Sequence, residues 1–541
     1  MSGTRPRIAV IGAGGSGLAA IKQCIEDGLE PVCFERESDL GGLWNFSDSS
    51  QLGKGSVYKN CVINTSKEMM AFSDFPPPES FPMFMPHRYV LKYFKMYAEK
   101  FGLFKNIWFD TSVLHVAPSD KYAVDGSWDV TYRRKHGEAE TARFAGVLVC
   151  TGHHTFPHTP SFTGLDQFRG TSLHSHGYKD NKQFAGKRVL VVGIGNSAVD
   201  IAVDVSHVAD EVFLSTRRGA WVISRMGFWG LPADAMANNR FLFSLPQSVL
   251  QWSVEKMANF RFNHEQYGLK PAHGALQAHP TINDELPYRI MTGAVRVKPN
   301  VYHFTERTVR FQDGTEEEID AIIFATGYDY KIGIIDESIT RIEKNKTSLY
   351  KYMYPPNLAH PTLAVIGLVQ PIGAVMPISE MQCRWFTQVI NGSRKLPDRQ
   401  TMTRDIEGKR EAMAATYISS QRHTLQCFWI QYMDELAAEV GVRPNMATLF
   451  REDPALALRC MFGPCLPAQY RIKGPGSWPG ARDAIITSMD RAMAPMKTRI
   501  LPKNFCSDVS ADKPVISIPK YLRSYFLLAF VFFLFFCLCM V

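Results

Sequence analysis

Short apolar runs that end in glycine-rich turns organise this sequence. Residues 7–11 form a β-branched apolar run, which a glycine-rich segment and then a small-residue, helix-like stretch follow. The same pattern returns about 180 residues later, at 187–202. Two more apolar runs, 147–152 and 322–327, each end in Thr-Gly. Each repeat predicts a strand, a turn and a helix, so we expect an α/β protein with two doubly wound, Rossmann-like dinucleotide-binding domains.

The order of the repeats predicts that one domain is inserted in the other. At 541 residues the chain is too long for a single ordinary core. We expect a discontinuous first dinucleotide-binding domain from residues 1–155 and 330–445, with the second dinucleotide-binding domain at 156–329 between its two parts. The segment 220–295 lacks the pattern and is rich in Trp, Phe and Met, which indicates a helical insertion. Residues 446–520 are predicted to be a membrane-proximal region and linker.

The C-terminal run from Tyr525 to Val541 predicts a membrane anchor. It carries no charge and consists mainly of Phe, Leu and Val. A helix of this length reaches roughly 26 Å, near the short end of what spans a bilayer. Lys513, Lys520 and Arg523 precede it and favour a cytoplasmic catalytic body. We therefore expect a single-pass transmembrane helix at 525–541 in a thin bilayer such as the endoplasmic reticulum membrane; a buried core helix is the alternative.

The composition limits the classes of partner that we expect this protein to bind. The net charge of +8 comes from scattered Lys and Arg, so we expect no nucleic acid, and a basic face would serve phospholipid or phosphorylated cofactors. The eleven cysteines contain no CxxC pair and no Cys/His cluster with zinc spacing. This pattern indicates free thiols in a reducing compartment and no metal site.

The first glycine-rich turn predicts an FAD site. Gly12, Gly14 and Gly17 fit G-x-G-x-x-G, whose glycines allow the tight turn, the approach to pyrophosphate and close helix packing. Glu35 ends the next strand, 18 residues past Gly17, where an acid accepts hydrogen bonds from ribose hydroxyls. A bare turn is the alternative. These residues predict a dinucleotide site, and in flavoproteins with two dinucleotide folds the N-terminal fold takes FAD. The FAD-binding residues expected here are Gly12, Ala13, Gly14, Gly15, Ser16, Gly17, Glu35, Leu43 and Trp44.

The second turn predicts an NADPH site. Its following strand runs into Arg217 with no acid, and an arginine in that place suits a 2′-phosphate. A surface arginine without a ligand is the alternative. Ala198 replaces the third glycine, a change that close packing tolerates. The residues expected to bind NADPH are Gly193, Gly195, Asn196, Ser197, Ala198, Val199, Asp200 and Arg217.

Two dinucleotide folds also describe disulfide reductases, which need a cysteine pair beside the flavin. The cysteine that follows Cys33 is Cys61, and it stands alone. Cys460 and Cys465 lie close together but far from either glycine-rich turn. The sequence therefore disfavours a disulfide reductase.

A segment just before the second turn resembles a known family. Phe168, Gly170, His174 and Tyr178 match the F-x-G-x-x-x-H-x-x-x-Y pattern of flavin-containing monooxygenases. The segments 35–44, 64–69 and 325–328 and the apolar C-terminus are also similar to that family, so the resemblance covers essentially the whole chain. Within the family, the segments 215–221, 376–380 and 421–424 are most similar to the fifth mammalian isoform type.

The resemblance implies a class B flavoprotein monooxygenase that uses FAD and NADPH. In that family NADPH reduces FAD, O₂ adds to give a C4a-hydroperoxyflavin, and NADP⁺ stays bound to shield it. The resemblance makes Asn64 the catalytic residue and places Thr65 beside FAD. A neutral amide can donate to such a peroxide without supplying a proton. From the residues alone, Asn64 is an ordinary turn residue, and we assign His174 and Tyr178 to positioning.

The fifth isoform type implies Baeyer–Villiger oxygenation of lipophilic ketones to esters or lactones, with N- or S-oxygenation of xenobiotics as an accompanying activity. The choice between ketones and heteroatoms rests on this likeness. An uncoupled NADPH oxidase that releases H₂O₂ and a non-catalytic, membrane-tethered flavoprotein scaffold are the alternatives. The partners expected are small lipophilic substrates, O₂ and a phospholipid membrane; the sequence leaves a homo-oligomer open.

Overall fold

The first glycine-rich turn belongs to a five-stranded parallel sheet. The computed structural model describes residues 5–499, and the strand order in this sheet is β22-β7-β1-β2-β3. Its strands are buried because helices cover a parallel sheet, which explains their continuous apolar runs. The strands are β1 (Arg7–Ile11), β2 (Glu30–Phe34), β3 (Ile107–Trp108), β7 (Gly146–Val149) and β22 (Leu363–Val365).

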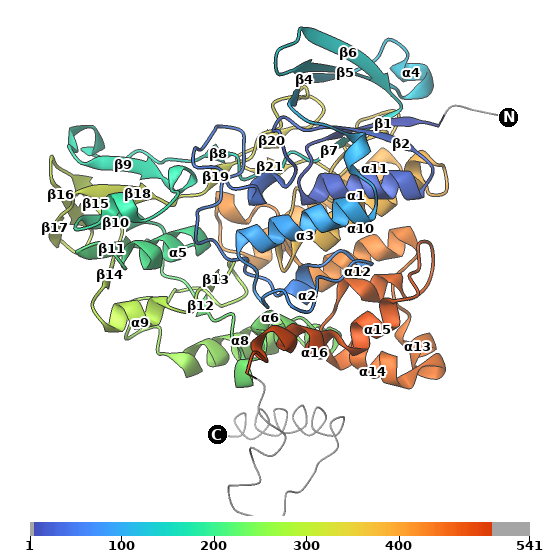
Figure 1. Ribbon diagram of the computed structural model, residues 1–541. Helices are drawn as coiled ribbons and strands as arrows, with labels where there is room; N and C mark the ends of the chain where they lie inside the picture. Colours follow the sequence, from blue (N-terminus) through green and yellow to red (C-terminus); the bar gives the residue numbers. More distant parts are fainter. Residues whose placement is uncertain (1–4, 500–541) are drawn as a thin grey trace, which may run out of the picture. The chain divides into compact units, whose positions relative to one another are not determined.

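Helices α1 (Gly15–Glu26), α3 (His87–Lys100) and α10 (Val375–Ile390) belong to this sheet's half of the molecule (Figure 1). Helix α1 is mostly buried because its small residues lie against both β1 and α10. The connection from β3 to β7 forms an antiparallel sheet of β4 (Thr111–Pro118), β5 (Trp128–Arg134) and β6 (Ala139–Phe144), with α4 (Tyr122–Asp125) inside it. The short helix α2 (Lys67–Met70) precedes α3.

The second glycine-rich turn belongs to a second parallel sheet of the same design. Its strand order is β14-β11-β10-β18-β9, and α5 (Asn196–Val205) follows β10 as α1 follows β1. Its strands are β9 (Thr171–His174), β10 (Arg188–Val192), β11 (Glu211–Ser215), β14 (Val295–Lys298) and β18 (Ala321–Phe324). An antiparallel sheet of β15 (Val301–Phe304), β16 (Thr308–Phe311) and β17 (Glu316–Glu318) leads into β18.

The segment between β11 and β14 combines short helices with long loops, although these two strands pair directly in the sheet. It contains α6 (Ala233–Ala237), α7 (Arg240–Phe243), α8 (Gln247–Arg261) and α9 (Leu286–Met291), and the short pair β12 (Val222–Ile223) and β13 (Thr281–Ile282). The long departure from the sheet explains why the glycine and strand pattern is missing from residues 220–295.

The remaining elements join and follow the two sheets. The paired short strands are β8 (Phe156–Pro157) with β19 (Tyr328–Asp329), β20 (Ile342–Glu343) with β21 (Lys346–Thr347), and β23 (Gln370–Ile372) with β24 (Gln426–Phe428). The later helices are α11 (Arg399–Thr416), α12 (Trp429–Val440), α13 (Met446–Glu452), α14 (Pro454–Phe462), α15 (Ala481–Ile486) and α16 (Ser488–Met493).

The structure corrects the predicted fold class in one part. Among residues 5–499 no helix combines the length and apolarity that crossing a membrane requires. The longest described helix, α11, has 18 residues and carries charged side chains along its length. The run predicted as an anchor, 525–541, lies outside the described residues, as does the linker at 500–520. The fold class is therefore α/β with two five-stranded parallel sheets. The prediction of a transmembrane helix as part of this fold class was wrong.

The described residues up to Pro495 form one compact unit. The domain boundaries near residues 155, 330 and 445 therefore stay predictions. The strands nevertheless divide by sheet: residues 7–149 and 363–365 supply the first parallel sheet, and residues 171–324 supply the second.

Candidate functional site

One cavity of about 1950 Å³ connects the two glycine-rich turns. The last residues of the central strands, Ile11 and Val192, contribute to its wall. The Thr-Gly pairs that follow β7 and β18 line it as well. In open α/β sheets, ligands bind outside the carboxyl ends of the strands, and this cavity lies at that edge of both sheets. A single cavity can therefore hold two dinucleotides whose reactive ends meet.

The first turn is shaped for close approach to a ligand. Gly12 has φ +99°, a conformation that L side chains rarely adopt. A Cβ on Gly17 would lie 1.8 Å from the carbonyl oxygen of Gly12, so only glycine fits there. Helix α1 then starts at Gly15, and among the described residues no side chain caps its N-terminus. The free N–H groups of this first helical turn suit a pyrophosphate.

Glu35 holds the first turn in place from the end of β2. Its Oε2 accepts a hydrogen bond from the main-chain N–H of Ala13 at 2.7 Å, and its Oε1 accepts one from Glu37 at 3.0 Å. Burial raises the pKa of this carboxyl, while the two backbone donors act in the opposite direction. The carboxylate also lines the cavity. It thus fixes the turn, a task that sequence reasoning missed, and it retains lone pairs for a ribose hydroxyl.

The second turn repeats this geometry. Gly193 has φ +127°, and a Cβ on it would lie 2.5 Å from the carbonyl oxygen of Ala325. Ala198, in the place of the third glycine, is fully buried on α5. No described side chain caps α5. Arg217 lines the cavity, is exposed and forms no ion pair with any residue between 5 and 499, so its guanidinium is available to a phosphate.

Asn64 faces the cavity with its amide orientation fixed. Its Oδ1 accepts a hydrogen bond of 2.6 Å from Nη2 of Arg225. Arg225 is held in turn by Asp284, whose Oδ2 lies 3.1 Å from Nη1. Because the amide oxygen is engaged, the amide nitrogen is the end left to donate within the cavity. Arg225 lies 161 residues away in sequence, and no local motif announces this contact.

The predicted site residues divide into those on the cavity wall and those behind it. Asp200 lies behind it, where its Oδ1 accepts a hydrogen bond of 2.8 Å from Nδ2 of Asn283 and burial raises its pKa. On the wall are Gly12, Gly14, Gly15, Ser16, Glu35, Leu43, Trp44, Asn64, Thr65, Gly193, Gly195, Asn196, Ser197, Ala198 and Arg217. Not among the lining residues are Ala13, Gly17, Val199 and Asp200. The role of each toward a cofactor stays a prediction.

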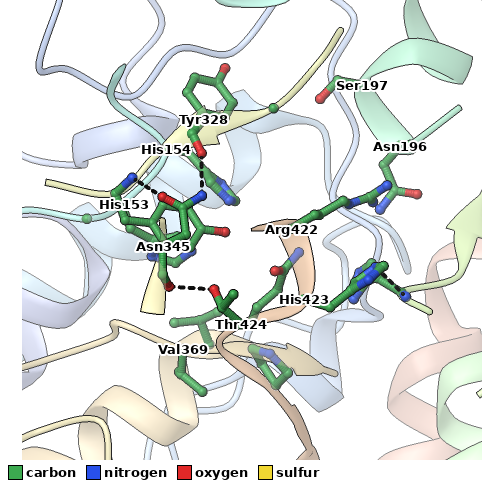
Figure 2. A pocket seen from close by; sticks show the side chains of 18 of the residues that line it. His153, His154, Asn196, Ser197, Tyr328, Asn345, Val369, Arg422, His423 and Thr424 are labelled. Atoms are coloured by element: carbon green, nitrogen blue, oxygen red, sulfur yellow. Dashed lines mark hydrogen bonds between the residues drawn. The ribbon is translucent and has the colours of Figure 1, made fainter. Parts of the chain in front are cut away.

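A group of histidines on the cavity wall was missed by sequence reasoning. Figure 2 shows His153 and His154 beside Tyr328, and Arg422 and His423 across the cavity. Burial lowers the pKa of His154 to about 4, and the nearby guanidinium of Arg422 acts in the same direction. Burial likewise lowers the pKa of His279 to about 3. These imidazoles are neutral at pH 7. The tripeptide 422–424 resembled the family in sequence, but nothing there indicated a role.

The segment that first indicated the family has a structural role. The hydroxyl of Tyr178 donates to Oδ2 of Asp204 at 2.5 Å, and the tyrosine is almost fully buried. Nδ1 of His174 accepts a hydrogen bond from the main-chain N–H of His176 at 3.1 Å. Phe168 is partly buried and packs against the hydrophobic cluster beside the second sheet. These contacts join the segment to α5 and the second sheet.

Comparison with known proteins identifies the family. The model of the flavin-binding monooxygenase-like family matches residues 5–538. Flavin-containing monooxygenase 5 of Homo sapiens is 51% identical over 508 residues, which is 93% of this chain and 95% of that protein. Dimethylaniline monooxygenase [N-oxide-forming] 2 of Mus musculus is 46% identical over 527 residues, or 96% and 98% of the two chains.

Solved structures share the fold at lower identity. S-allyl-L-cysteine S-oxygenase from Allium sativum has a TM-score of 0.64 at 23% identity and covers 91% of this chain and 100% of its own. Cyclohexanone monooxygenase from Rhodococcus sp. Phi1, bound to NADP⁺, has a TM-score of 0.58 at 17% identity, with 81% and 98% covered. These likenesses show the fold alone. The family match and the half-identical relatives show that this chain belongs to the flavin-binding monooxygenase-like family and is an FAD-dependent oxidoreductase.

Proposed function

We propose that this flavin monooxygenase uses NADPH and O₂ to insert one oxygen atom beside the carbonyl of lipophilic ketones. The reaction consumes one ketone, one O₂, one NADPH and one proton, and it yields an ester or lactone, NADP⁺ and water. Oxygenation of amines and sulfides is proposed as an accompanying activity. The observation that carries the proposal is the single cavity that both glycine-rich turns and Asn64 line.

The residues of this cavity fit the two cofactors. The first turn, with its glycine cradle and uncapped helix, suits the FAD pyrophosphate, and Glu35 suits the adjoining ribose. The second turn suits the NADPH pyrophosphate, and Arg217 in place of an acid suits the 2′-phosphate. Bound FAD supplies two-electron transfer and the activation of O₂, which no amino-acid side chain provides.

The protein's part in the chemistry is to position groups and to limit proton access. Arg225 holds the Asn64 amide so that its N–H₂ group donates within the cavity. A neutral amide stabilises negative charge on oxygen without giving up a proton. The imidazoles of His154 and His279, which line the same cavity, have lowered pKa values and are neutral at pH 7. These two imidazoles therefore add no acidic proton to the cavity at pH 7.

The relatives support more than one substrate class. By their names, one relative forms N-oxides and one structural neighbour oxygenates sulfur, while another structural neighbour oxygenates cyclohexanone. Ketones are proposed as the main class because the chain resembles the fifth isoform type in sequence. Flavin-containing monooxygenase 5 is 51% identical, against 46% for the N-oxide-forming relative.

Product analysis tests the proposal. The flavin-loaded protein is incubated with NADPH, O₂ and either a linear ketone or a sulfide of matched chain length, and esters, sulfoxides, H₂O₂ and NADPH are quantified. We expect ester formation with the ketone at the greater kcat/KM. Sulfoxide without ester would overturn the ketone assignment. H₂O₂ equal to the NADPH consumed, at saturating ketone and saturating sulfide, would show an NADPH oxidase instead.

A further inference from the structure

Arg422 reaches the second glycine-rich turn from a distant part of the chain. It lies in the short turn between α11 and β24, whereas the turn it approaches lies between β10 and α5. A Cβ built on Gly195 would be 2.7 Å from Nη1 of Arg422 and 3.0 Å from its Cζ. The guanidinium therefore lies against the glycine where α5 begins. Figure 2 shows the side chain extending across the cavity toward Asn196.

Hydrogen bonds fix the backbone around Arg422, and its side chain lines the cavity. The hydroxyl of Ser420 accepts a hydrogen bond from the main-chain N–H of Arg422 at 3.2 Å. Nε2 of His423 accepts one from the N–H of His279 at 3.3 Å, and the hydroxyl of Thr424 donates to the carbonyl of Asn345 at 2.5 Å. Three side-chain contacts thus hold the segment. Such an anchored segment presents the guanidinium at a defined position.

The charge of Arg422 has no carboxylate partner in the part of the chain that the structure describes. Arg422 is partly buried, and its partial removal from water lowers its pKa, while Tyr330 acts in the opposite direction. Its positive charge lowers the pKa values of the neighbouring imidazoles of His154, His279 and His423. A partly buried cation among neutral groups is stabilised when an anion binds it. The cavity that it faces is continuous with the dinucleotide site.

We propose that Arg422 binds the pyrophosphate of the nicotinamide dinucleotide, clamping it against the N-terminus of α5. The proposal rests on the proposed NADPH site. The free N–H groups of α5 approach the phosphates from one side, and the guanidinium donates from the other. Arg217 and Arg422 then have separate tasks: Arg217 recognises the 2′-phosphate that distinguishes NADPH from NADH, and Arg422 holds the pyrophosphate that both share.

This division of tasks makes the proposal testable by equilibrium binding. The dissociation constants of NADP⁺ and NAD⁺ are measured by titration calorimetry on the oxidised, flavin-loaded protein, so the readout does not depend on turnover. The variants are Arg422→Gln, Arg422→Lys and Arg217→Ala. Arg404→Gln is the matched control, because Arg404 is an exposed arginine on α11 whose guanidinium donates to Thr401 of the same helix at 3.4 Å and does not line the cavity.

We expect Arg422→Gln to raise the dissociation constants of NADP⁺ and NAD⁺ by the same factor. This factor is on the order of ten- to a hundredfold, because charge-assisted hydrogen bonds are lost. Arg422→Lys, which keeps the charge but not the planar fork, is expected to lie between this variant and the wild type. Arg217→Ala is expected to raise the dissociation constant of NADP⁺ and to leave that of NAD⁺ unchanged. Arg404→Gln is expected to leave both constants unchanged.

Several results would overturn the proposal. Unchanged affinity for both nucleotides would remove Arg422 from the site, and a loss confined to NADP⁺ would assign it to the 2′-phosphate. Loss of flavin absorbance with unchanged nucleotide binding would assign it to FAD. An unchanged NADP⁺ constant with a raised KM for a carboxylated ketone would assign it to an anionic substrate. A wild-type protein that binds flavin but neither nucleotide would reject the NADPH assignment itself.

A second measurement distinguishes a misfolded variant from an informative one. In the correctly folded Arg422→Gln protein, the pKa values of His154, His279 and His423 rise because a positive charge beside them is gone. Imidazole titration by NMR detects that rise without any ligand. Unchanged imidazole titration in a folded variant would show that the guanidinium is not where the proposal needs it.

Discussion

The contact between Arg225 and Asn64 gives the sharpest prediction about catalysis. Nη2 of Arg225 lies 2.6 Å from the amide oxygen of Asn64, and the arginine side chain is only 13% exposed. Hydrogen bonds to charged groups are worth about 1.5–3 kcal/mol, so the opposite orientation of the amide is strongly disfavoured. In Arg225→Met the two orientations become similar in energy. The amide N–H₂ group then faces the cavity for roughly half of the time.

The size of the effect follows from this orientation argument. At saturating NADPH and ketone, we expect Arg225→Met to lower the rate of ester formation about twofold. Asn64→Leu removes the donor altogether and is expected to cost on the order of a hundredfold, as for other donors to developing negative charge. Arg225→Met leaves Asp284 hydrogen-bonded to Ser224 and to the main-chain N–H of residue 225. The variant should therefore fold.

The assay is the rate of ester formation per flavin, with active-site concentration fixed by flavin absorbance. Arg261→Gln is the control, because Arg261 donates to the main-chain carbonyl of Asp284 at 2.5 Å but is not in contact with Asn64. An unchanged rate in Arg225→Met would mean that other groups orient the amide. A loss as large as that of Asn64→Leu would mean that the guanidinium acts on the reacting atoms itself. Either result would refute the reasoning.

Three further changes test the scaffold. Gly17→Ala places a Cβ 1.8 Å from a main-chain carbonyl oxygen and should abolish flavin retention, measured by the absorbance of the purified protein. In Gly408→Ala the new Cβ on α11 has no neighbouring atom within 4 Å, so this variant should instead raise the free energy of unfolding by about 0.5–1 kcal/mol. Tyr178→Phe removes a hydrogen bond to buried Asp204 and should lower the unfolding free energy by about 1–3 kcal/mol while KM for NADPH stays constant. Burial raises the pKa of Asp234 to about 6 from 3.8, so the folded state takes up its proton first as pH falls. Wild type should gain about 2 kcal/mol of unfolding free energy over Asp234→Asn between pH 6 and 4 in denaturant titrations, and a constant difference would contradict this cause.

The sequence predicted the parts of the site that local geometry determines. Gly12, Gly17 and Gly193 occupy positions where φ or a neighbouring carbonyl allows no side chain, so a motif reveals them. The spacing of Glu35 from the turn predicted a ribose-binding acid, and this carboxylate lines the cavity. Its second role is to accept a hydrogen bond from the main-chain N–H of Ala13, and this contact is visible only in the three-dimensional structure.

Contacts between distant segments were not predictable from one sequence. Arg225 and Arg422 each reach the cavity from stretches whose sequence did not indicate a role in the site, because a single side chain placed by tertiary packing leaves no periodic signal. Asp200 looked like a cavity residue from its place after the second turn. The helical period turns it away from the cavity wall, toward Asn283.

Strand β22 is synthesised long after the other strands of the first sheet, and this order affects how the nascent chain folds. Residues 171–324 supply every strand of the second parallel sheet, so that sheet can close while the ribosome is still translating the residues after 324. The first sheet starts earlier but ends later, since β7 keeps an unpaired edge until residues 363–365 emerge. Exposed strand edges promote aggregation. We therefore expect the nascent chain to depend most on chaperones between the appearance of β7 and that of β22.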